Sequence, residues 1–394
     1  MRLNATVLTA ALVAGVIAFF SAEANAQHLP DDFYFPTEEI SGNVFQSEEV
    51  TFWLQTVVDG LNDAWALAFL PDGRVLITEK SGNLRIVEDG ELSPQIIGGT
   101  PTVFNRNQGG LLDVALHPDF ISNQLVYIAY SYSQAGTSNT AIGRGRLDGY
   151  MLHDFEEIFR GHPNTARPFH FGSRIVFDAD GYLYFAIGDR GVMENAQLVT
   201  NHAGKSFRLY DDGRVPRDNP FVNTSDGMPE IFTLGNRNIQ GMVVHPETGE
   251  VWSHEHGPRG GDEINILRRG RNYGWPVITH GIDYDGSPIS PDTAAVGMEQ
   301  PLHHWTPSIA PSGMAIVHNS SRYEGWNGNV FSGALAGRHL NRIVVDLENE
   351  RAVHEERLVS GLARIRDVRF APDGFLYIID ESNGRVLRLV PIGD

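Results

Sequence analysis

One strand-turn-strand pattern recurs along most of the chain and constrains the fold more than any other feature. Each copy has an apolar strand, a turn containing Pro, Asp or Gly, and a second apolar strand, as in the stretch from Ala66 to Thr78. Copies begin near residues 67, 114, 175, 242, 315 and 368, and the copy near 315 is the weakest. Short β-branched and aromatic runs bounded by Asp-Gly and Pro signals are typical of hairpins. The repeat therefore predicts an all-β fold, a six-bladed β-propeller.

The two segments before the first copy are predicted to form a closing strand and an extended arm. Residues 52–58 are apolar, and we expect them to supply a strand to the last blade and so close the ring. Residues 27–49 contain acids, Pro and Phe without a clear period, which indicates an extended N-terminal arm. The propeller domain is expected to span residues 50–394. The spacing of the copies exceeds a minimal blade, so the extra residues should form loops that carry the functional site.

The N-terminus resembles an export signal. Arg2 is followed by an apolar run over 7–20, and Ala24-Asn25-Ala26 matches a small-residue cleavage site. The run is shorter than the roughly 20 residues of a membrane-spanning helix, although an uncleaved anchor is the alternative. We expect residues 1–26 to be a signal peptide and the mature chain to be periplasmic or secreted, with no membrane span.

Composition excludes several classes of function. The net charge of −19 argues against nucleic acid as a partner. The chain has no cysteine, which excludes disulfides, thiolate zinc sites and covalently attached haem. Lys80 and Lys205 are the only lysines, so a Schiff-base mechanism has almost no candidates.

Several loops between the strands carry polar motifs that a propeller scaffold does not need. The motifs are Asn107-Gln-Gly-Gly-Leu-Leu-Asp113, His170-Phe-Gly-Ser-Arg174, Gly235-Asn-Arg-Asn-Ile-Gln-Gly241, Glu255-His-Gly-Pro-Arg-Gly-Gly-Asp-Glu-Ile-Asn265, Gly270-Arg-Asn-Tyr-Gly-Trp-Pro276 and Arg364-Ile-Arg-Asp-Val368. Loops that converge on the axis of a propeller can combine such residues into one site.

Together and in this order, the motifs resemble the soluble pyrroloquinoline quinone (PQQ) dependent glucose and aldose sugar dehydrogenases. The resemblance runs from about Trp65 to Leu389. It implies a six-bladed propeller with the cofactor on its top face. It also implies oxidation of the anomeric hydroxyl of an aldose sugar to a lactone, with electrons passed to an external acceptor such as a quinone, a cytochrome or a dye.

His170 is the catalytic candidate that the resemblance implies. It matches the general base that takes the proton of the anomeric hydroxyl, and a neutral imidazole suits that task near neutral pH. The resemblance also places Arg174 beside the cofactor's quinone oxygens, with a structural salt bridge as the alternative.

The cofactor has three carboxylates, so its pocket should offer forked cationic donors. By resemblance, the lining positions are Gln108, Arg237, Asn238, Arg364 and Arg366. Arg364 and Arg366 alternate on a strand and should point to the same face, although a solvated basic edge is the alternative. A lysine of many relatives is replaced here by Ala336, and we expect Arg338 to supply its charge.

Calcium is the metal that the resemblance implies. The carbonyl oxygens of Gly257 and Pro258 match the ligands of a calcium that also contacts the quinone, and hard oxygen ligands suit this ion. Glu263, Tyr273 and Asp283 match a second, structural calcium site. His254 and His256 alternate on a strand and could mimic a transition-metal pair, but no third ligand is evident.

Two other classes of function remain as alternatives. A calcium-dependent sugar-lactone hydrolase would use His170 and a metal, but it would not need Arg237, Arg364 and Arg366 together. A non-catalytic propeller that binds a glycan or a protein would not need the base. The acidic surface favours a soluble monomer or dimer.

Overall fold

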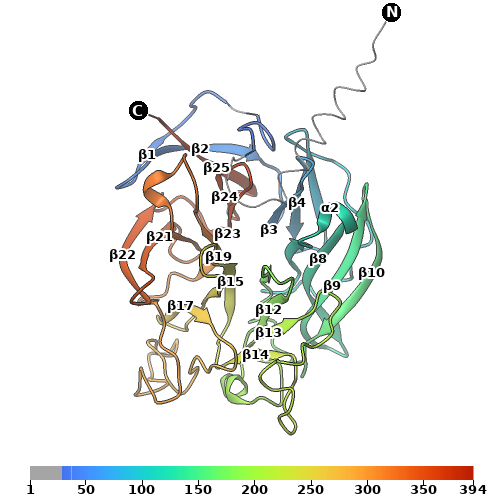
Figure 1. Ribbon diagram of the computed structural model, residues 1–394, viewed down its shortest axis with the longest axis vertical. Coiled ribbons are helices and arrows are strands. Elements are labelled where there is room, and N and C mark those ends of the chain that lie inside the picture. The colour runs from blue at the N-terminus through green and yellow to red at the C-terminus, as the bar shows by residue number, and fades with distance from the viewer. Residues whose placement is uncertain (1–28, 37, 394) are drawn as a thin grey trace, which may run out of the picture.

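The computed structural model describes residues 29–36 and 38–393, and the regular secondary structure in this part of the chain is almost entirely antiparallel β-sheet. Six sheets are arranged around a common centre, which confirms the predicted six-bladed β-propeller (Figure 1). The expected signal peptide over residues 1–26 lies outside the described residues.

The six sheets follow one another along the chain, and we number the blades in that order. Blade 1 contains β3 (Ala64–Phe69), β4 (Val75–Glu79), β5 (Leu84–Glu88) and β6 (Glu91–Leu92). Blade 2 contains β7 (Leu111–Leu116), β8 (Leu125–Gln134), β9 (Thr137–Asp148) and β10 (Met151–Arg160). Blade 3 contains β11 (Ile175–Phe177), β12 (Leu183–Ile187), β13 (Lys205–Leu209) and β14 (Ile231–Leu234).

The second half of the chain continues this order. Blade 4 contains β15 (Ile239–Val244), β16 (Val251–Glu255), β17 (Asp262–Leu267) and β18 (His303–Trp305). Blade 5 contains β19 (Pro311–Ile316), β20 (Val330–Ala334), β21 (Leu340–Asp346) and β22 (Arg351–Leu358). Blade 6 contains β23 (Ile365–Phe370), β24 (Leu376–Asp380), β25 (Arg385–Pro391), β2 (Thr51–Val58) and β1 (Val44–Gln46).

In the part of the chain that the structure describes, the helices are short and lie in the connections. They are α2 (Phe120–Asn123) and the 3-10 turns η1 (Met193–Gln197) and η2 (Glu324–Trp326). Among the described residues, no helix has the length and apolar character needed to cross a membrane.

The first strand of each blade lines the centre of the ring. The six repeat copies recognised in the sequence coincide with these first strands, and each first strand contacts the first strands of the neighbouring blades. The strands consequently start together on one face of the molecule. The loops that precede them converge on that face, as the sequence predicts.

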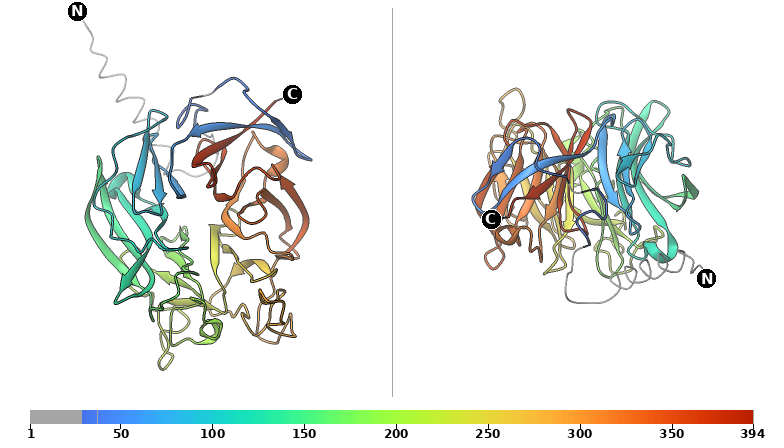
Figure 2. Two further views of the ribbon diagram at one scale, coloured as in Figure 1. Left: turned by 180° about the vertical axis from the view of Figure 1, so that it is seen from behind. Right: turned by 90° about the horizontal axis from the view of Figure 1, so that it is seen from above.

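The ring is closed by a strand from the N-terminal part of the chain. β2 pairs antiparallel with β25, and Phe52 lies opposite Pro391, which confirms the expected closure (Figure 2). The preceding residues are more ordered than a free arm. Val44–Gln46 pair with β2 as a fifth strand, and the side chains of Tyr34 and Phe35 are buried.

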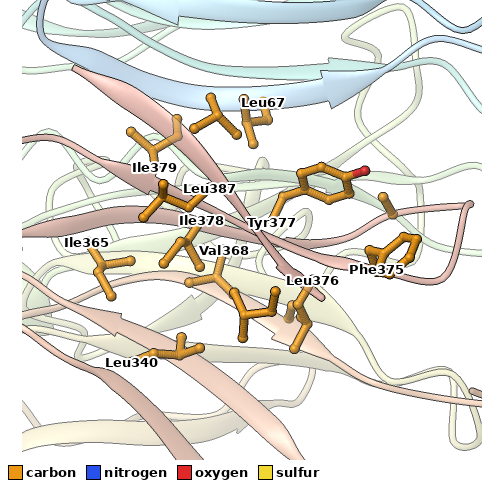
Figure 3. Packing of buried hydrophobic residues seen from close by; sticks show 14 of the residues in the cluster. Leu67, Leu340, Ile365, Val368, Phe375, Leu376, Tyr377, Ile378, Ile379 and Leu387 are labelled. Carbon is orange, nitrogen blue, oxygen red and sulfur yellow. The ribbon is translucent and has the colours of Figure 1, made fainter. Parts of the chain in front are cut away.

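Apolar contacts between blades join the two ends of the ring. Figure 3 shows Leu67 of blade 1 and Leu340 of blade 5 in one cluster with Val368, Leu376 and Ile378 of blade 6. All five side chains are buried. The closing blade is therefore packed against both of its neighbours.

Candidate functional site

A cavity of 370 Å³ lies where the blades meet, and we call it the axial cavity. Every blade contributes to its wall. Its lining residues are Trp65, Lys80, Asn107, Gln108, Leu112, Phe171, Gly172, Gln240, His256, Ala310, Leu335, Arg364, Arg366 and Glu381. Most of them lie where a first strand begins or just after a second strand ends, so the cavity opens on the face on which the motif loops converge.

A second cavity of 430 Å³ shares Asn107 and Gln108 with the axial cavity, and we call it the side cavity. Its other lining residues are Arg167, Phe169, His170, Asp189, Gly191, Met193, Arg237, Pro258, Trp275, Asp283, Tyr284 and Ile289. The two volumes fall in the usual range for small-molecule sites. The structure thus places the predicted base beside a cavity that adjoins the cation-lined centre.

His170 forms a dyad with Asp189 on the wall of the side cavity. Its Nδ1 lies 2.6 Å from Oδ1 of Asp189. The other carboxylate oxygen of Asp189 accepts a hydrogen bond of 2.9 Å from the indole Nε1 of Trp275, and Gly191 N donates to Oδ1 at 2.7 Å. Asp189 was not among the residues predicted from sequence.

The dyad determines the chemical state of the imidazole. An ionised carboxylate can only accept, so Nδ1 carries the proton and Nε2 keeps a free lone pair. Burial lowers the pKa of His170, as do the charges of Arg237 and Arg190, whereas Asp189 opposes the shift. Burial raises the pKa of Asp189, but its hydrogen bond and charge interaction with His170 outweigh this and hold the pKa below its usual value. A neutral imidazole beside an ionised carboxylate is the arrangement of a general base.

Gln108 connects the base to the boundary between the cavities. Its Oε1 accepts a hydrogen bond of 2.8 Å from the backbone N of His170. Its own backbone N donates to the carbonyl oxygen of Pro168 at 3.2 Å. The structure therefore brings these two sequence-predicted residues together.

Arg237 and Asn238 lie close to the dyad and keep donors without partners. Arg237 Nη1 donates to the carbonyl oxygens of His256 at 3.1 Å and Gly257 at 2.8 Å. Buried Glu255 orients the turn, because its carboxylate accepts from the backbone N of Arg237 and from that of Asn238. Within the described chain, Arg237 Nε and Asn238 Nδ2 are buried and have no hydrogen-bond partner. Arg237 lines the side cavity, where a polar ligand would satisfy its free donor, whereas Asn238 lines neither cavity.

Arg364 and Arg366 both line the axial cavity, and they point to the same face as predicted. Each pairs with Glu381, Arg364 through Nε at 2.8 Å and Arg366 through Nη2 at 2.6 Å. Burial raises the pKa of Glu381, but these ion pairs outweigh it and lower the pKa overall. The two arginines thus contribute two charges against one carboxylate, which leaves the pair net positive.

Lys80 provides a further cation that sequence reasoning did not assign to the site. It follows the last residue of β4 and lines the axial cavity, where its Nζ donates to the carbonyl oxygen of Asn107 at 2.8 Å. Arg338, by contrast, is exposed in the turn between β20 and β21 and lines neither cavity. The turn places its side chain outside the site, so the expected contact of Arg338 with the cofactor is not supported by its position.

Arg174 occupies the position of a structural ion pair. Its Nη1 lies 3.1 Å from Asp113 Oδ1 and 2.9 Å from Asp367 Oδ1, and its guanidinium stacks 4.3 Å from the Trp65 ring. The side chain is buried and lines neither cavity. These contacts support the alternative of a structural salt bridge, in which Arg174 joins a carboxylate of blade 2 to one of blade 6. Its position does not support the expected catalytic role, which stays a prediction.

The predicted ligands of the first calcium lie at the site. Pro258 lines the side cavity together with His170. The carbonyl oxygen of Gly257 accepts the hydrogen bond from Arg237, and a carbonyl has a second lone pair for a cation.

The predicted ligands of the second calcium are not seen as one cluster. Asp283 lines the side cavity, whereas Glu263 lies opposite Glu255 in the β16–β17 pair, and the hydroxyl of Tyr273 donates to the carbonyl oxygen of Ile266. Burial raises the pKa of Glu263, and the neighbouring charge of Glu255 adds to the shift. Among residues 29–36 and 38–393, no group of three or more His, Asp or Glu side chains could hold a metal. The second site stays a prediction.

Comparison with known proteins decides the family. The model of the glucose/sorbosone dehydrogenase family matches residues 61–388. The chain belongs to this family. It is 42% identical over 346 residues to the aldose sugar dehydrogenase YliI of Escherichia coli, covering 86% of this chain and 92% of the relative.

Solved structures of the glucose/sorbosone dehydrogenase family agree with this assignment. The crystal structure of the soluble aldose sugar dehydrogenase from Escherichia coli in the apo form superposes with a TM-score of 0.83 at 41% identity, covering 86% of this chain and 100% of the other. The PQQ-bound form of aldose sugar dehydrogenase from Streptomyces coelicolor has a TM-score of 0.71 at 27% identity, covering 86% and 98%.

Proposed function

We propose that this protein is a PQQ-dependent, calcium-assisted aldose sugar dehydrogenase that oxidises the anomeric hydroxyl of an aldose to a lactone. The observation that carries the proposal is the His170–Asp189 dyad on a cavity adjoining a second, cation-lined cavity. A base beside a site for a polyanionic quinone is what hydride abstraction from a sugar requires.

The residues of the axial cavity fit PQQ. Three cations line this cavity and would bind the carboxylates of PQQ: Lys80, Arg364 and Arg366. One acid, Glu381, lines the same wall. Arg237, which lines the adjoining side cavity and keeps a free donor, adds a hydrogen-bond partner there. When bound, PQQ supplies the acceptor for the hydride that leaves the anomeric carbon.

His170 takes the proton from the anomeric hydroxyl at Nε2. Asp189 holds the ring through Nδ1, fixes the tautomer and stabilises the imidazolium that forms. Trp275 and the backbone N of Gly191 in turn hold the carboxylate of Asp189, so the base has little freedom to rotate. The sugar loses a proton to His170 and a hydride to the cofactor, which balances its oxidation to the lactone.

Calcium is assigned to the carbonyl oxygens of Gly257 and Pro258, where it would polarise the quinone. A structural calcium is proposed at Glu263, with Tyr273 and Asp283. The reason is that the carboxylates of Glu263 and Glu255 are both buried and lie opposite each other, and a divalent cation would stabilise such a pair. We further propose export through residues 1–26 to the periplasm or medium, a monomeric or dimeric state, and transfer of electrons to a quinone, cytochrome or dye.

Titration of the metal-stripped mature protein with PQQ tests the proposal, with absorbance of the cofactor as the readout and parallel runs in calcium and in chelator. We expect tight binding in calcium, weaker binding in chelator, and aldose oxidation with a dye acceptor by the loaded protein. Absence of PQQ binding under both conditions would contradict the proposal. Turnover of sugar lactones would then assign a hydrolase, and inactivity would favour a binding propeller.

A further inference from the structure

Arg190 follows Asp189 directly in the chain and is an unusual charged residue near the site, because within the described chain it is buried without an ion pair. Its side chain is fully buried, yet among the described residues it forms no ion pair. Nη1 donates to the carbonyl oxygen of Phe169, and Nη2 donates to that of Arg167 at 2.9 Å. Nη2 also contacts Oγ of Ser138 at 3.2 Å and its carbonyl oxygen at 3.3 Å. The charge of neighbouring Asp189 stabilises this cation, but only from beyond ion-pair distance. A buried cation is costly, so its retention without a paired carboxylate calls for a function.

All of these contacts surround the base. The bonded carbonyls belong to residues 167 and 169, just before His170, and the guanidinium stacks 3.7 Å from the ring of Phe171, just after it. One planar group therefore holds the backbone before the imidazole and packs on the aromatic ring of the residue after it. Ser138 connects the same group to β9 of the neighbouring blade.

His170 needs such support because its backbone is in an unfavourable conformation. Its φ is +58°, in the left-handed region that non-glycine residues rarely adopt. Gly172 and Ser173 follow with φ of +66° and +94°. A segment of this kind persists only where its surroundings hold it in place. The hydrogen bond from His170 N to Gln108 and that from Gly172 N to Asn238 are two restraints, and the carbonyl bonds of Arg190 add to them.

The positive charge of Arg190 also favours the neutral form of the base. Burial lowers the pKa of Arg190 to about 9, which still leaves the group protonated at neutral pH. Together with Arg237, it contributes to the lowered pKa of His170. A cation beneath the loop thus favours the neutral imidazole that accepts a proton.

We propose that Arg190 is a positioning residue for the base: it holds the backbone before His170 and the ring of Phe171 after it, and so keeps the imidazole hydrogen-bonded to Asp189. Arg190 lines neither cavity, so it touches neither sugar nor cofactor. The catalytic consequence rests on the proposed function, whereas the effect on the His170–Asp189 hydrogen bond does not.

The variants Arg190→Met and Arg190→Lys test this role against Arg388→Met. Arg388 is a matched control because it is also fully buried and also binds backbone carbonyls, those of Asp31, Phe35 and Pro36, but it lies in blade 6. NMR of the metal-free and cofactor-free protein reports the Nδ1 proton and the pKa of His170, assigned by comparison with His170→Gln. Steady-state kinetics of the loaded enzyme report kcat and KM.

In folded Arg190→Met we expect the Nδ1 proton signal to weaken or broaden, the pKa of His170 to rise and kcat to fall about tenfold to a hundredfold, with KM changed less. Arg190→Lys keeps the charge but cannot span three carbonyls, so the pKa should stay near the wild-type value while kcat still falls. Arg388→Met should lower thermal stability and leave the His170 signal and kcat unchanged.

An unchanged Nδ1 signal and unchanged kcat in folded Arg190→Met would overturn the proposal, as would equal effects in Arg388→Met. If Arg190→Met does not fold, Arg190→Lys decides, and wild-type kcat in that variant overturns the role. If the wild-type protein oxidises no aldose, the proposed function fails, and the NMR signals alone decide whether Arg190 positions His170.

Discussion

The carboxylate of Asp189 divides its two oxygens between the imidazole of His170 and the indole of Trp275, and this division sets the chemistry of the site. His170 could be predicted from sequence because it stands in a compact motif with Gly172 and Arg174. Asp189 could not be predicted, because it ends a repeat copy just after β12 and looks like a structural residue of the blade. Lys80 and Glu381 also follow the second strand of a blade. A charged residue one or two positions after the second strand of a blade is therefore the sequence signal that would have found all three.

The pKa of His170 gives the first prediction at this scale. Burial and the charges of Arg237 and Arg190 lower the pKa of His170 below the ordinary histidine value of 6.5. The neutral imidazole should therefore persist to a more acidic pH than in free histidine. An NMR titration of the cofactor-free protein, assigned with His170→Gln, should show a midpoint below that value. A midpoint above it would mean that Asp189 outweighs burial.

Lys80 gives the second prediction. Lys80→Met removes a cation from the axial cavity and should weaken PQQ binding about tenfold to a hundredfold, the usual effect of one charged hydrogen bond. Absorbance titration measures it, and Lys80→Arg should restore most of the affinity. Arg338→Met is the control and should bind as the wild type does. Loss of affinity in Arg338→Met alone would instead support the role expected for Arg338 from sequence.

At the scale of elements, the blades were predictable because apolar strands and Asp-Gly turns recur in each copy. The strand over 52–58 was also predictable, and it pairs with β25 as expected. β1 was not, because it has three residues and its Val44 is 52% exposed, so no alternation of apolar residues marks it. The left-handed backbone at His170 likewise has no sequence signal, because it is imposed by contacts from distant segments.

Closure of the ring by β2 gives a prediction for stability. Phe52 is buried, stacks on Phe45 with ring centroids 5.8 Å apart, and packs edge-to-face against Trp326 of the neighbouring blade at 5.6 Å. Phe52→Ala should lower the free energy of unfolding by about 3–5 kcal/mol, measured by urea denaturation. Val44→Ala in the same sheet should change it by no more than about 0.5 kcal/mol. Equal effects of the two substitutions would show that β2 is not a closing element.

At the scale of the whole molecule, a buried ion network joins blades at the axis. Asp113 of blade 2 and Asp367 of blade 6 both bond Arg174 and Arg369, and Asp367 Oδ2 accepts from the backbone N of Leu67 in blade 1 at 3.0 Å. Sequence showed these charges but not their pairing, because the partners are up to 256 positions apart. Pairing over such distances is visible only once the ring is closed.

Arg174→Met tests this structural role. Removing one partner leaves two buried carboxylates undercompensated, so the free energy of unfolding should fall by about 3–5 kcal/mol in urea denaturation. Arg338→Met removes an exposed arginine and serves as the reference. A loss below about 0.5 kcal/mol in Arg174→Met would argue against a stabilising network and would return Arg174 to the candidates for the site.

The central claim is that His170 takes the proton when PQQ in the adjoining cavity takes the hydride. The most direct measurement mixes PQQ-loaded protein with a panel of aldoses without oxygen and follows cofactor absorbance, in the wild type and in His170→Gln. We predict that the wild type reduces bound PQQ with at least one aldose. His170→Gln should bind PQQ equally well but reduce it about 100-fold to 10,000-fold more slowly. Reduction at the wild-type rate in the variant, or none in PQQ-bound wild type, would contradict the account.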